Sequence, residues 1–507
     1  MERLMRAKKS IVLVTVDCLR ADHVGFMGYG RPTTPFLDSL ANESLVFPLA
    51  IVGGAPTYYS LPTILSSRYP LAIGRDVLGL APEEPTLASA LKECGYATAA
   101  FSAGNPYLSK RFGYEQGFDT FRDCLDESAA PSASTSVAAP SIGWTSRLNR
   151  AVRRVRPSLG PLGALYDEAY FQYCQRVTPA ANSLDELRRF PAADVIVDHA
   201  CEWLASVGEA PFFLWLHVMD PHAPYYPTDG ALALMGDQVT PSRARYLNSY
   251  WNRSDLGSSR LSRHRDDIVT LYDAGIRWVD AQMERLVQTL RNSNAWGDCI
   301  FALTADHGEE FLDHAGRYHP PSRLMEEVIH APLLIRVPGA EKREIAKDCF
   351  SLLHLAPTLL DMANAPRPAT FRGRSYFAQV QAGSGPESTA ISESVSACTN
   401  PFRSQDRLGP RVLSIRESRY KLVLHFDPPK ECLYDLEADP GEQAPLAPVS
   451  QKSVRRRLLE VALEHVRQSS NQRDQSARAR SRLRELRLEW KKPADKASHE
   501  LSQRDSS

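Results

Sequence analysis

The stretch Cys299-Ile-Phe-Ala-Leu-Thr-Ala-Asp-His-Gly-Glu-Glu310 decides the fold more clearly than any other part of the chain. Its first seven residues are apolar enough to form a buried strand. They run directly into an acid and an imidazole, Asp306 and His307. Gly308 allows the backbone to turn away behind these two side chains. A carboxylate and an imidazole delivered to the edge of a sheet predict half of a metal site.

A second apolar run, Ile11 to Val16, ends in the same way at Asp17. Amphipathic stretches such as Ile276–Leu290 separate runs of this kind, and the alternation predicts an α/β fold with a mostly parallel sheet between helices. The other runs that we expect to be strands are Thr98–Ser102, Phe212–Leu216, Ile300–Thr304 and Pro332–Val337. Polar residues follow four of the strands, and ligands of such sheets collect at the carboxyl ends of the strands.

Five motifs occur in an order and spacing that resemble the sulfatase family of the alkaline-phosphatase superfamily. They are VTVDCLRADHVGFMGYG, APTYYSLPTILSSRYP, LWLHVMDPHAPYYP, TADHGEEF and LYDLEADPGE. The resemblance covers roughly residues 9 to 445 and implies an alkaline-phosphatase-like fold. It also implies a sulfatase-like catalytic domain over residues 1–365 and a C-terminal subdomain with a small antiparallel sheet over 366–450.

Two segments stand apart in composition. Residues from about 127 to 160 begin with a run rich in Ser, Ala and Pro, and we interpret them as a flexible insertion. Residues 451–507 are charged and helix-prone and then polar, which predicts a docking helix followed by a disordered end.

The resemblance implies that Asp17, Asp306 and His307 bind one divalent metal ion. The family often has two adjacent acids at the first of these positions, but here the second residue is Cys18. Two carboxylates, an imidazole and a hydroxyl suit manganese, zinc or iron, because imidazole is a poor ligand for calcium; calcium stays an alternative.

The nucleophile also departs from the family pattern. Counting back from Arg68-Tyr-Pro70 places Thr57 where sulfatases have the Cys or Ser that is oxidised to formylglycine. Formylglycine cannot form from threonine, so we expect a metal-bound Thr57 hydroxyl to be the nucleophile. Ser60, which begins Ser-Leu-Pro-Thr, is the alternative nucleophile or a substrate contact.

The resemblance gives roles to four more residues. His222 matches the histidine of the leaving group, and an imidazole can donate a proton near neutral pH. His319 stands where relatives have a lysine or histidine that contacts the anionic group. Asn105 and His217 fall at further positions that contact substrate. Each of the four could also be an ordinary hydrogen-bonded polar residue.

The chain has 507 residues, with 60 Lys and Arg against 60 Asp and Glu. Such a balance creates no overall field that would select nucleic acid or a membrane surface, so we expect a small anionic ester as the only partner, and the sequence does not define an oligomeric state. The N-terminal apolar run is too short for a signal peptide and no run reaches the ~20 residues of a membrane span, so we expect a cytoplasmic protein.

Nine cysteines are scattered without a Cys-x-x-Cys pair. This arrangement indicates neither a disulfide framework nor a zinc module, and we interpret most of the cysteines as small buried side chains. Cys18 lies closest to the predicted metal site; we favour a packed thiol there, with a functional role as the alternative.

The sequence therefore predicts a metal-dependent hydrolase of sulfate or phosphate esters. A phosphoryl transferase, phosphodiesterase or phosphonate monoester hydrolase on the same fold is one alternative. A non-catalytic sulfatase-like protein that binds an anion is another.

Overall fold

The structure is a computed structural model that describes residues 8–75, 77–126, 161–340, 343–344, 349–382 and 389–468. The insertion that the sequence predicts at about 127–160 lies outside the described residues. So does most of the predicted C-terminal tail, residues 469–507.

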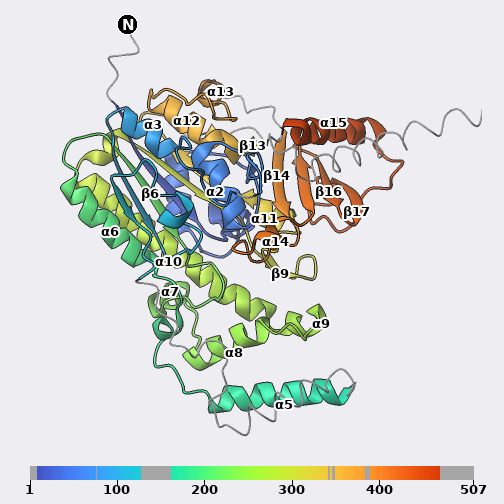
Figure 1. Cartoon of the computed structure of the whole chain (residues 1–507). Coiled ribbons are helices and arrows are strands. Elements are labelled where there is room, and N and C mark those ends of the chain that lie inside the picture. The colour runs from blue at the N-terminus through green and yellow to red at the C-terminus, as the bar shows by residue number, and fades with distance from the viewer. Residues whose placement is uncertain are drawn as a thin grey trace, which may run out of the picture.

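A sheet flanked by helices forms the centre of the molecule (Figure 1). It has eight strands in the order β12-β2-β11-β7-β1-β6-β4-β5. Its strands are β1 (Ser10–Val16), β2 (Leu45–Val46), β4 (Ala97–Ser102), β5 (Thr120–Arg122), β6 (Phe212–Val218), β7 (Cys299–Ala305), β11 (Leu333–Arg336) and β12 (Arg343–Glu344). β6 and β7 are buried along their whole length, which is why they read as continuous apolar runs in the sequence.

The sheet is mostly parallel, as predicted. β7, β1, β6, β4 and β5 run in the same direction, whereas β11 is antiparallel to both β7 and β2. The expected strand at Pro332–Val337 is therefore present, but its chain direction is opposite to that of its neighbour.

Helices cover both faces of this sheet (Figure 1). On one side α6 packs on β6 and β4, and α10 packs on α6, α7 and α1. On the other side α3 packs on β4, and α12 packs on α2 and α3. Their bounds are α1 (Pro35–Leu40), α2 (Thr57–Ser66), α3 (Leu87–Glu93), α6 (Ala193–Ser206), α7 (Asp229–Met235), α10 (Arg265–Asn292) and α12 (Leu355–Met362).

Three further helices form an arm that projects away from the sheet (Figure 1). They are α5 (Pro161–Val177), α8 (Pro241–Trp251) and α9 (Ser258–Leu261). Within the arm, Arg253 connects α5 to the end of α8. Its guanidinium lies 2.7 Å from the Glu168 carboxylate and over the ring of Phe171, both on α5. The sequence motifs did not indicate this arm.

A separate antiparallel sheet carries the C-terminal part of the described chain. Its strands are β14 (Ala390–Val395), β15 (Arg411–Arg416), β16 (Tyr420–Phe426) and β17 (Pro429–Asp435), in sequence order. α15 (Lys452–Gln468) packs its apolar side, including Leu458 and Leu463, against Leu413 and Leu422 of this sheet. The predicted small antiparallel sheet and docking helix are both present, while the exact domain boundaries stay a prediction.

The described residues also form several short strands and helices. They are β3 (Ala50–Ile51), β10 (His330–Ala331) and β13 (Phe350–Ser351), which form a three-stranded sheet, the pair β8 (Glu310–Phe311) and β9 (Arg317–Tyr318), and the helices α11 (Glu326–Ile329), α13 (Phe377–Gln381) and α14 (Ser404–Arg407).

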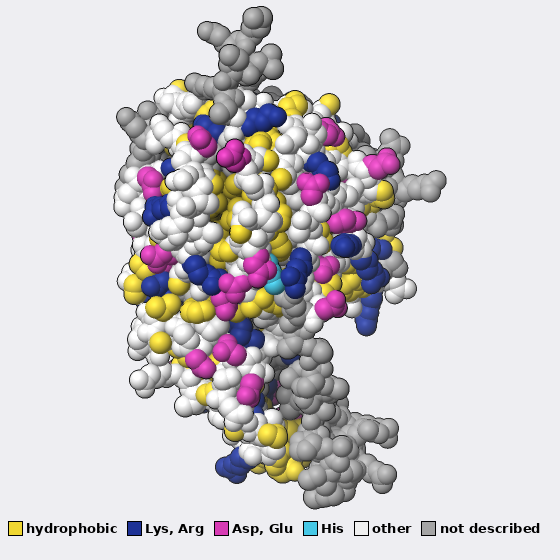
Figure 2. Space-filling model, turned by 90° about the vertical axis from the view of Figure 1, so that its left-hand side faces the viewer, with side chains coloured by type: hydrophobic (Ala, Val, Ile, Leu, Met, Phe, Trp, Pro, Cys, Tyr) yellow, Lys and Arg dark blue, Asp and Glu magenta, His cyan; other side chains and the backbone are white. Residues whose placement is uncertain are grey.

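The surface shown in Figure 2 mixes Lys and Arg side chains with Asp and Glu side chains, without a continuous region of one sign on that face. Among the described residues, the structure contains no helix that is both long enough and apolar enough to span a membrane.

Candidate active site

Four neighbouring parallel strands deliver polar side chains to one edge of the sheet. Val16 at the end of β1 is in register with Val218 on one side and Ala305 on the other, so Asp17 and Asp306 emerge next to each other. His217 lies at the end of β6, opposite Ser102 of β4. The strand ends thus place these groups together although they are up to 289 residues apart in the sequence.

Asp17, Asp306 and His307 form the centre of this edge, and all three are fully buried. His307 Nε2 lies 3.7 Å from Asp17 Oδ1 and 3.6 Å from Asp306 Oδ2. His307 Nδ1 lies 2.9 Å from the carbonyl oxygen of Gly308, to which it can donate its proton. That hydrogen bond leaves the lone pair of Nε2 facing the two carboxylates.

The sequence predicted that Gly308 lets the chain turn, but the structure gives a different reason for this glycine. A Cβ atom at this position would lie 2.0 Å from the carbonyl oxygen of Glu327, while the φ angle of Gly308 is not in the left-handed region. Close approach of a neighbouring backbone therefore excludes a side chain here.

Thr57 reaches the same point from the first turn of α2. Its Oγ1 lies 3.3 Å from Asp17 Oδ2 and 3.2 Å from His307 Nε2. Ser60 Oγ instead donates to the carbonyl oxygen of Thr57 over 3.2 Å, within the same helix. The structure thus brings the Thr57 hydroxyl to the acids and directs the Ser60 hydroxyl to its own backbone.

The two carboxyls of the centre have opposite pKa shifts. Burial raises the pKa of Asp17, but the charge of His222 and the hydrogen bond from His217 outweigh burial and hold this pKa well below its usual range. Burial and the adjacent charge of Asp17 raise the pKa of Asp306 well above its usual range. Two buried carboxyl groups this close repel each other when both are ionised, unless a cation lies between them.

These residues fit a divalent metal ion. Asp306 Oδ2 is buried and accepts no hydrogen bond from any described residue. Burial and the neighbouring His319 lower the pKa of His307 to about 3, so its imidazole is neutral, as a metal ligand must be. Asp17, Asp306, His307 and the Thr57 hydroxyl are therefore the side chains that could hold the ion, and two carboxylates, a hydroxyl and one imidazole suit a transition metal.

His217 and Asn105 both contact Asp17. His217 Nε2 lies 3.3 Å from Asp17 Oδ2, and its Nδ1 lies 2.9 Å from Thr15 Oγ1. Asn105 Nδ2 donates to the same Asp17 oxygen over 3.0 Å. Both side chains thus fix the carboxylate in place; their contact with a substrate stays a prediction.

His222 and His319 line the open side of the site, where both are only partly buried. Their ring centroids are 5.2 Å apart, and the ring of His319 also lies 4.5 Å from that of His307. His222 follows β6, and His319 follows the short strand β9.

The sequence missed two members of the site. Cys18 was interpreted as a buried packing residue, but its Sγ lies 3.2 Å from Asp17 Oδ1 and 3.3 Å from His319 Nδ1. Glu309 is fully buried beside them, and burial raises the pKa of its carboxyl to about 7. Its place three residues after Asp306 in a strand-end motif was the only signal in the sequence.

Comparisons with known proteins give the family of the chain. The family model described as "Sulfatase" matches residues 9–365, and the model described as "N-sulphoglucosamine sulphohydrolase, C-terminal" matches residues 316–469.

Individual proteins are similar over nearly the whole chain. The multifunctional alkaline phosphatase superfamily protein PehA of Trinickia caryophylli is 22% identical over 488 residues, which cover 87% of this chain and 91% of the relative. An arylsulfatase of Hemicentrotus pulcherrimus is 22% identical over 501 residues, covering 90% of this chain and 81% of the relative. The solved phosphonate monoester hydrolase of Agrobacterium radiobacter superposes with a TM-score of 0.63 at 21% identity, covering 92% of this chain and 97% of that one.

Proposed function

The chain belongs to the sulfatase family as one of its ester hydrolases, and from this premise we propose that it cleaves a small sulfate or phosphate ester with a divalent metal ion and Thr57 as the nucleophile. One observation carries the proposal. The Thr57 hydroxyl lies within 3.3 Å of Asp17 and 3.2 Å of His307, at the point where the metal-binding side chains converge.

Asp17, Asp306 and His307 would hold the ion. When bound, a divalent cation neutralises the non-bridging oxygens of the ester and lowers the pKa of a hydroxyl beside it. The N-terminus of α2 adds a partial positive charge at Thr57, which also favours an anionic group at this position.

The chain's own groups account for the proton and the covalent steps. Thr57 Oγ1 donates toward Asp17 Oδ2, so the carboxylate can accept its proton when the oxygen attacks sulfur or phosphorus. The bond between that atom and the leaving oxygen then breaks; the leaving oxygen keeps the electron pair and takes a proton from the protonated imidazole of His222 on the open side. Water later hydrolyses the sulfo or phospho ester on Thr57 and restores the hydroxyl.

A phosphonate monoester or phosphodiester substrate is the second candidate. It is favoured by the similarity to PehA, whose name describes a multifunctional alkaline phosphatase superfamily protein, and by the likeness to a phosphonate monoester hydrolase. All these substrates place an anionic tetrahedral centre at the same nucleophile.

The test is a panel of aryl sulfate, phosphate monoester, phosphodiester and phosphonate monoester substrates. We expect wild-type protein to hydrolyse at least one of them and Thr57→Ala to lose activity by about 10³-fold or more on each. Thr57→Ser should keep part of the activity because the attacking oxygen survives. Ser66→Ala, at the far end of the same helix, controls for folding.

Two results would overturn the proposal. Full activity of Thr57→Ala together with loss in Ser60→Ala would transfer the nucleophile to Ser60. A folded wild-type protein that holds metal but hydrolyses none of the four substrates would instead favour the non-catalytic, anion-binding alternative.

A further inference from the structure

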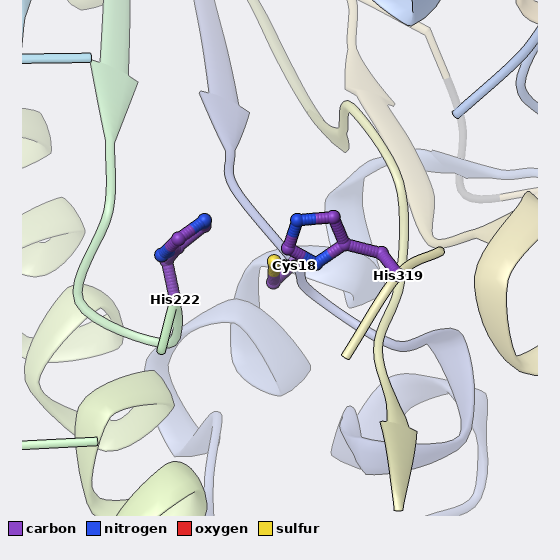
Figure 3. Close-up of side chains that lie close together, drawn as sticks. All are labelled: Cys18, His222 and His319. Atoms are coloured by element: carbon purple, nitrogen blue, oxygen red, sulfur yellow. Dashed lines mark hydrogen bonds between the residues drawn. The ribbon is translucent and has the colours of Figure 1, made fainter. Parts of the chain in front are cut away.

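Cys18, His222 and His319 form a cluster on the open side of the site (Figure 3). One ligand atom from each residue lies within 4.8 Å of those from the other two. We propose that these three side chains bind a second metal ion, next to the ion held by Asp17, Asp306 and His307. The proposal extends the proposed function, because it assumes that the first ion occupies the same site.

The donor set selects a particular class of metal. A thiolate and two imidazoles are the ligands of zinc and of similar soft divalent ions, and three protein ligands leave an open position. Ligand atoms around a tetrahedral zinc ion lie roughly 3.3–3.8 Å apart, given bond lengths of about 2.0–2.3 Å. The cluster must therefore close by about 1 Å. The partly exposed rings of His222 and His319 have the freedom to do so.

His222 already has the orientation of a metal ligand. Its Nδ1 lies 2.5 Å from the carbonyl oxygen of Ala223, so the ring proton resides on Nδ1. The lone pair of Nε2 is then available to the site. Histidines that bind metals usually donate their other ring N–H to such an acceptor.

The backbone holds Cys18 toward this cluster. Its φ angle of 61° is in the left-handed region, which is uncommon for a residue with a side chain. Tyr272 Oη donates to the Cys18 carbonyl over 2.7 Å, and the Cys18 amide donates to Asp306 Oδ1 over 3.3 Å. These contacts maintain a conformation that aims Sγ at His319, 3.3 Å from its Nδ1.

Glu309 gives an independent indication of a missing cation. Its side chain is fully buried and lies against the Cys18 thiol, which hydrogen-bonds to its carboxyl group. One of its carboxylate oxygens lies 3.4 Å from His319 Nδ1, beside the proposed ion. A fully buried carboxylate that has no arginine or lysine partner destabilises the fold unless a cation compensates its charge.

Charge balance leads to the same number of ions. Once a metal ion has displaced the thiol proton of Cys18, this thiolate and the carboxylates of Asp17, Asp306 and Glu309 carry four negative charges, which two divalent cations neutralise. Metal binding would release the thiol proton, because only the thiolate is a ligand.

A second group of potential ligands, Glu310, His314 and Glu327, provides a contrast. Glu310 Oε1 accepts hydrogen bonds from Arg323 and from the amide of Gly316, each over 2.6 Å. His314 Nδ1 is paired with Glu327 at 2.7 Å. This group already has its partners and needs no cation.

The second ion changes the role of His222. A cation on the open side would compensate the charge of the leaving oxygen directly. His222 would then act as a ligand of that ion, and the proton that the sequence assigned to His222 would no longer be required. Metal-binding measurements can therefore distinguish His222 as a metal ligand from His222 as a proton donor, without an activity assay.

The test uses the full-length protein, stripped with a chelator and reloaded with Co²⁺ or Zn²⁺. We expect two equivalents of metal per chain, and in the Co²⁺ form a near-ultraviolet sulfur-to-cobalt charge-transfer band. His222→Ala and His319→Ala should each weaken binding of one equivalent by at least about tenfold. Cys18→Ser should abolish the band. Asp306→Asn should lose the other equivalent and keep the band.

The control is Cys299→Ala, which removes a fully buried thiol at the opposite end of β7 and should retain both equivalents and the band. One equivalent of metal without the band would overturn the proposal. So would a band that survives both histidine variants but disappears in Asp306→Asn, because the thiolate would then belong to the first ion.

These outcomes are distinct from failure of the proposed function. A protein with two equivalents that hydrolyses no substrate would refute the function and leave the second site intact. Hydrolysis by a protein that binds only one equivalent would refute the second site alone.

Discussion

Replacing Glu393 by glutamine should weaken the attachment of the C-terminal sheet to the main domain. Glu393 lies on β14 and is fully buried. It accepts a hydrogen bond from the amide of Leu71 in the main domain over 2.8 Å and lies 2.9 Å from Nε2 of His465 on α15. Arg411 of β15 is 3.7 Å away. One carboxylate therefore connects the main domain with both layers of the C-terminal subdomain.

The pKa of Glu393 gives the expected loss in the free energy of unfolding. Burial raises this pKa, but the charges of His465 and Arg411 and the hydrogen bond from His465 outweigh burial and lower it from 4.5 to about 2. The difference between 4.5 and about 2 corresponds to about 3 kcal/mol of stability at neutral pH. Because the folded-state pKa is depressed, this contribution is present above about pH 4.5 and is lost as the pH falls toward about 2.

The assay is urea unfolding of wild type and Glu393→Gln, followed by circular dichroism at pH 7 and pH 3. The difference in the free energy of unfolding should be about 3 kcal/mol at pH 7 and should shrink to about 1–2 kcal/mol at pH 3. Glu417→Gln is the matched control, since its partner Arg457 is half-exposed and such surface pairs contribute less than about 1 kcal/mol. The reasoning would be refuted if Glu393→Gln lowered the free energy of unfolding at pH 7 no more than Glu417→Gln does. It would also be refuted if the effect of Glu393→Gln were the same at pH 3 as at pH 7.

Three further predictions follow from the site, the backbone and the sequence. Asp306→Ala should lose about one equivalent of transition metal by elemental analysis; calcium as the only metal in the wild type, or an unchanged metal content in the variant, would count against the site. Gly308→Ala should lower the free energy of unfolding by about 1–3 kcal/mol, because its Cβ would collide with the Glu327 carbonyl oxygen. Gly297→Ala, which meets no atom within 4 Å, is its control, and equal stabilities would contradict the clash. The cytoplasmic location stays a prediction, and recovery mainly from the medium or periplasm on cell fractionation would disprove it.

Much of the central sheet could be predicted because buried parallel strands appear as continuous apolar runs. The predicted runs at Ile11–Val16 and Phe212–Leu216 lie inside β1 and β6, and Ile276–Leu290 lies inside α10. The direction of β11 could not be predicted, since pairing with β7 and β2 is decided by residues far away in the sequence. The helical arm was missed because no motif falls on α5 or α8.

The strand-end residues of the site could be predicted for the same reason. Asp17, His217 and Asp306 come directly from adjacent strands, so the register of the sheet brings them together. Cys18 and Glu309 could not be assigned, because their orientation depends on a left-handed backbone at Cys18 and on a loop that returns toward β1. Neither feature leaves a periodic pattern in the sequence.

The central claim is that Thr57 attacks the ester, and detection of the covalent intermediate tests it most directly. Wild-type protein is mixed with the best substrate of the panel, quenched in acid within the first turnover, digested and examined by mass spectrometry. We predict a sulfo or phospho group on Thr57 of the peptide that contains Thr57 and Ser60, and its absence in Thr57→Ala. The same group on Ser60, or turnover by Thr57→Ala at the wild-type rate, would contradict the account.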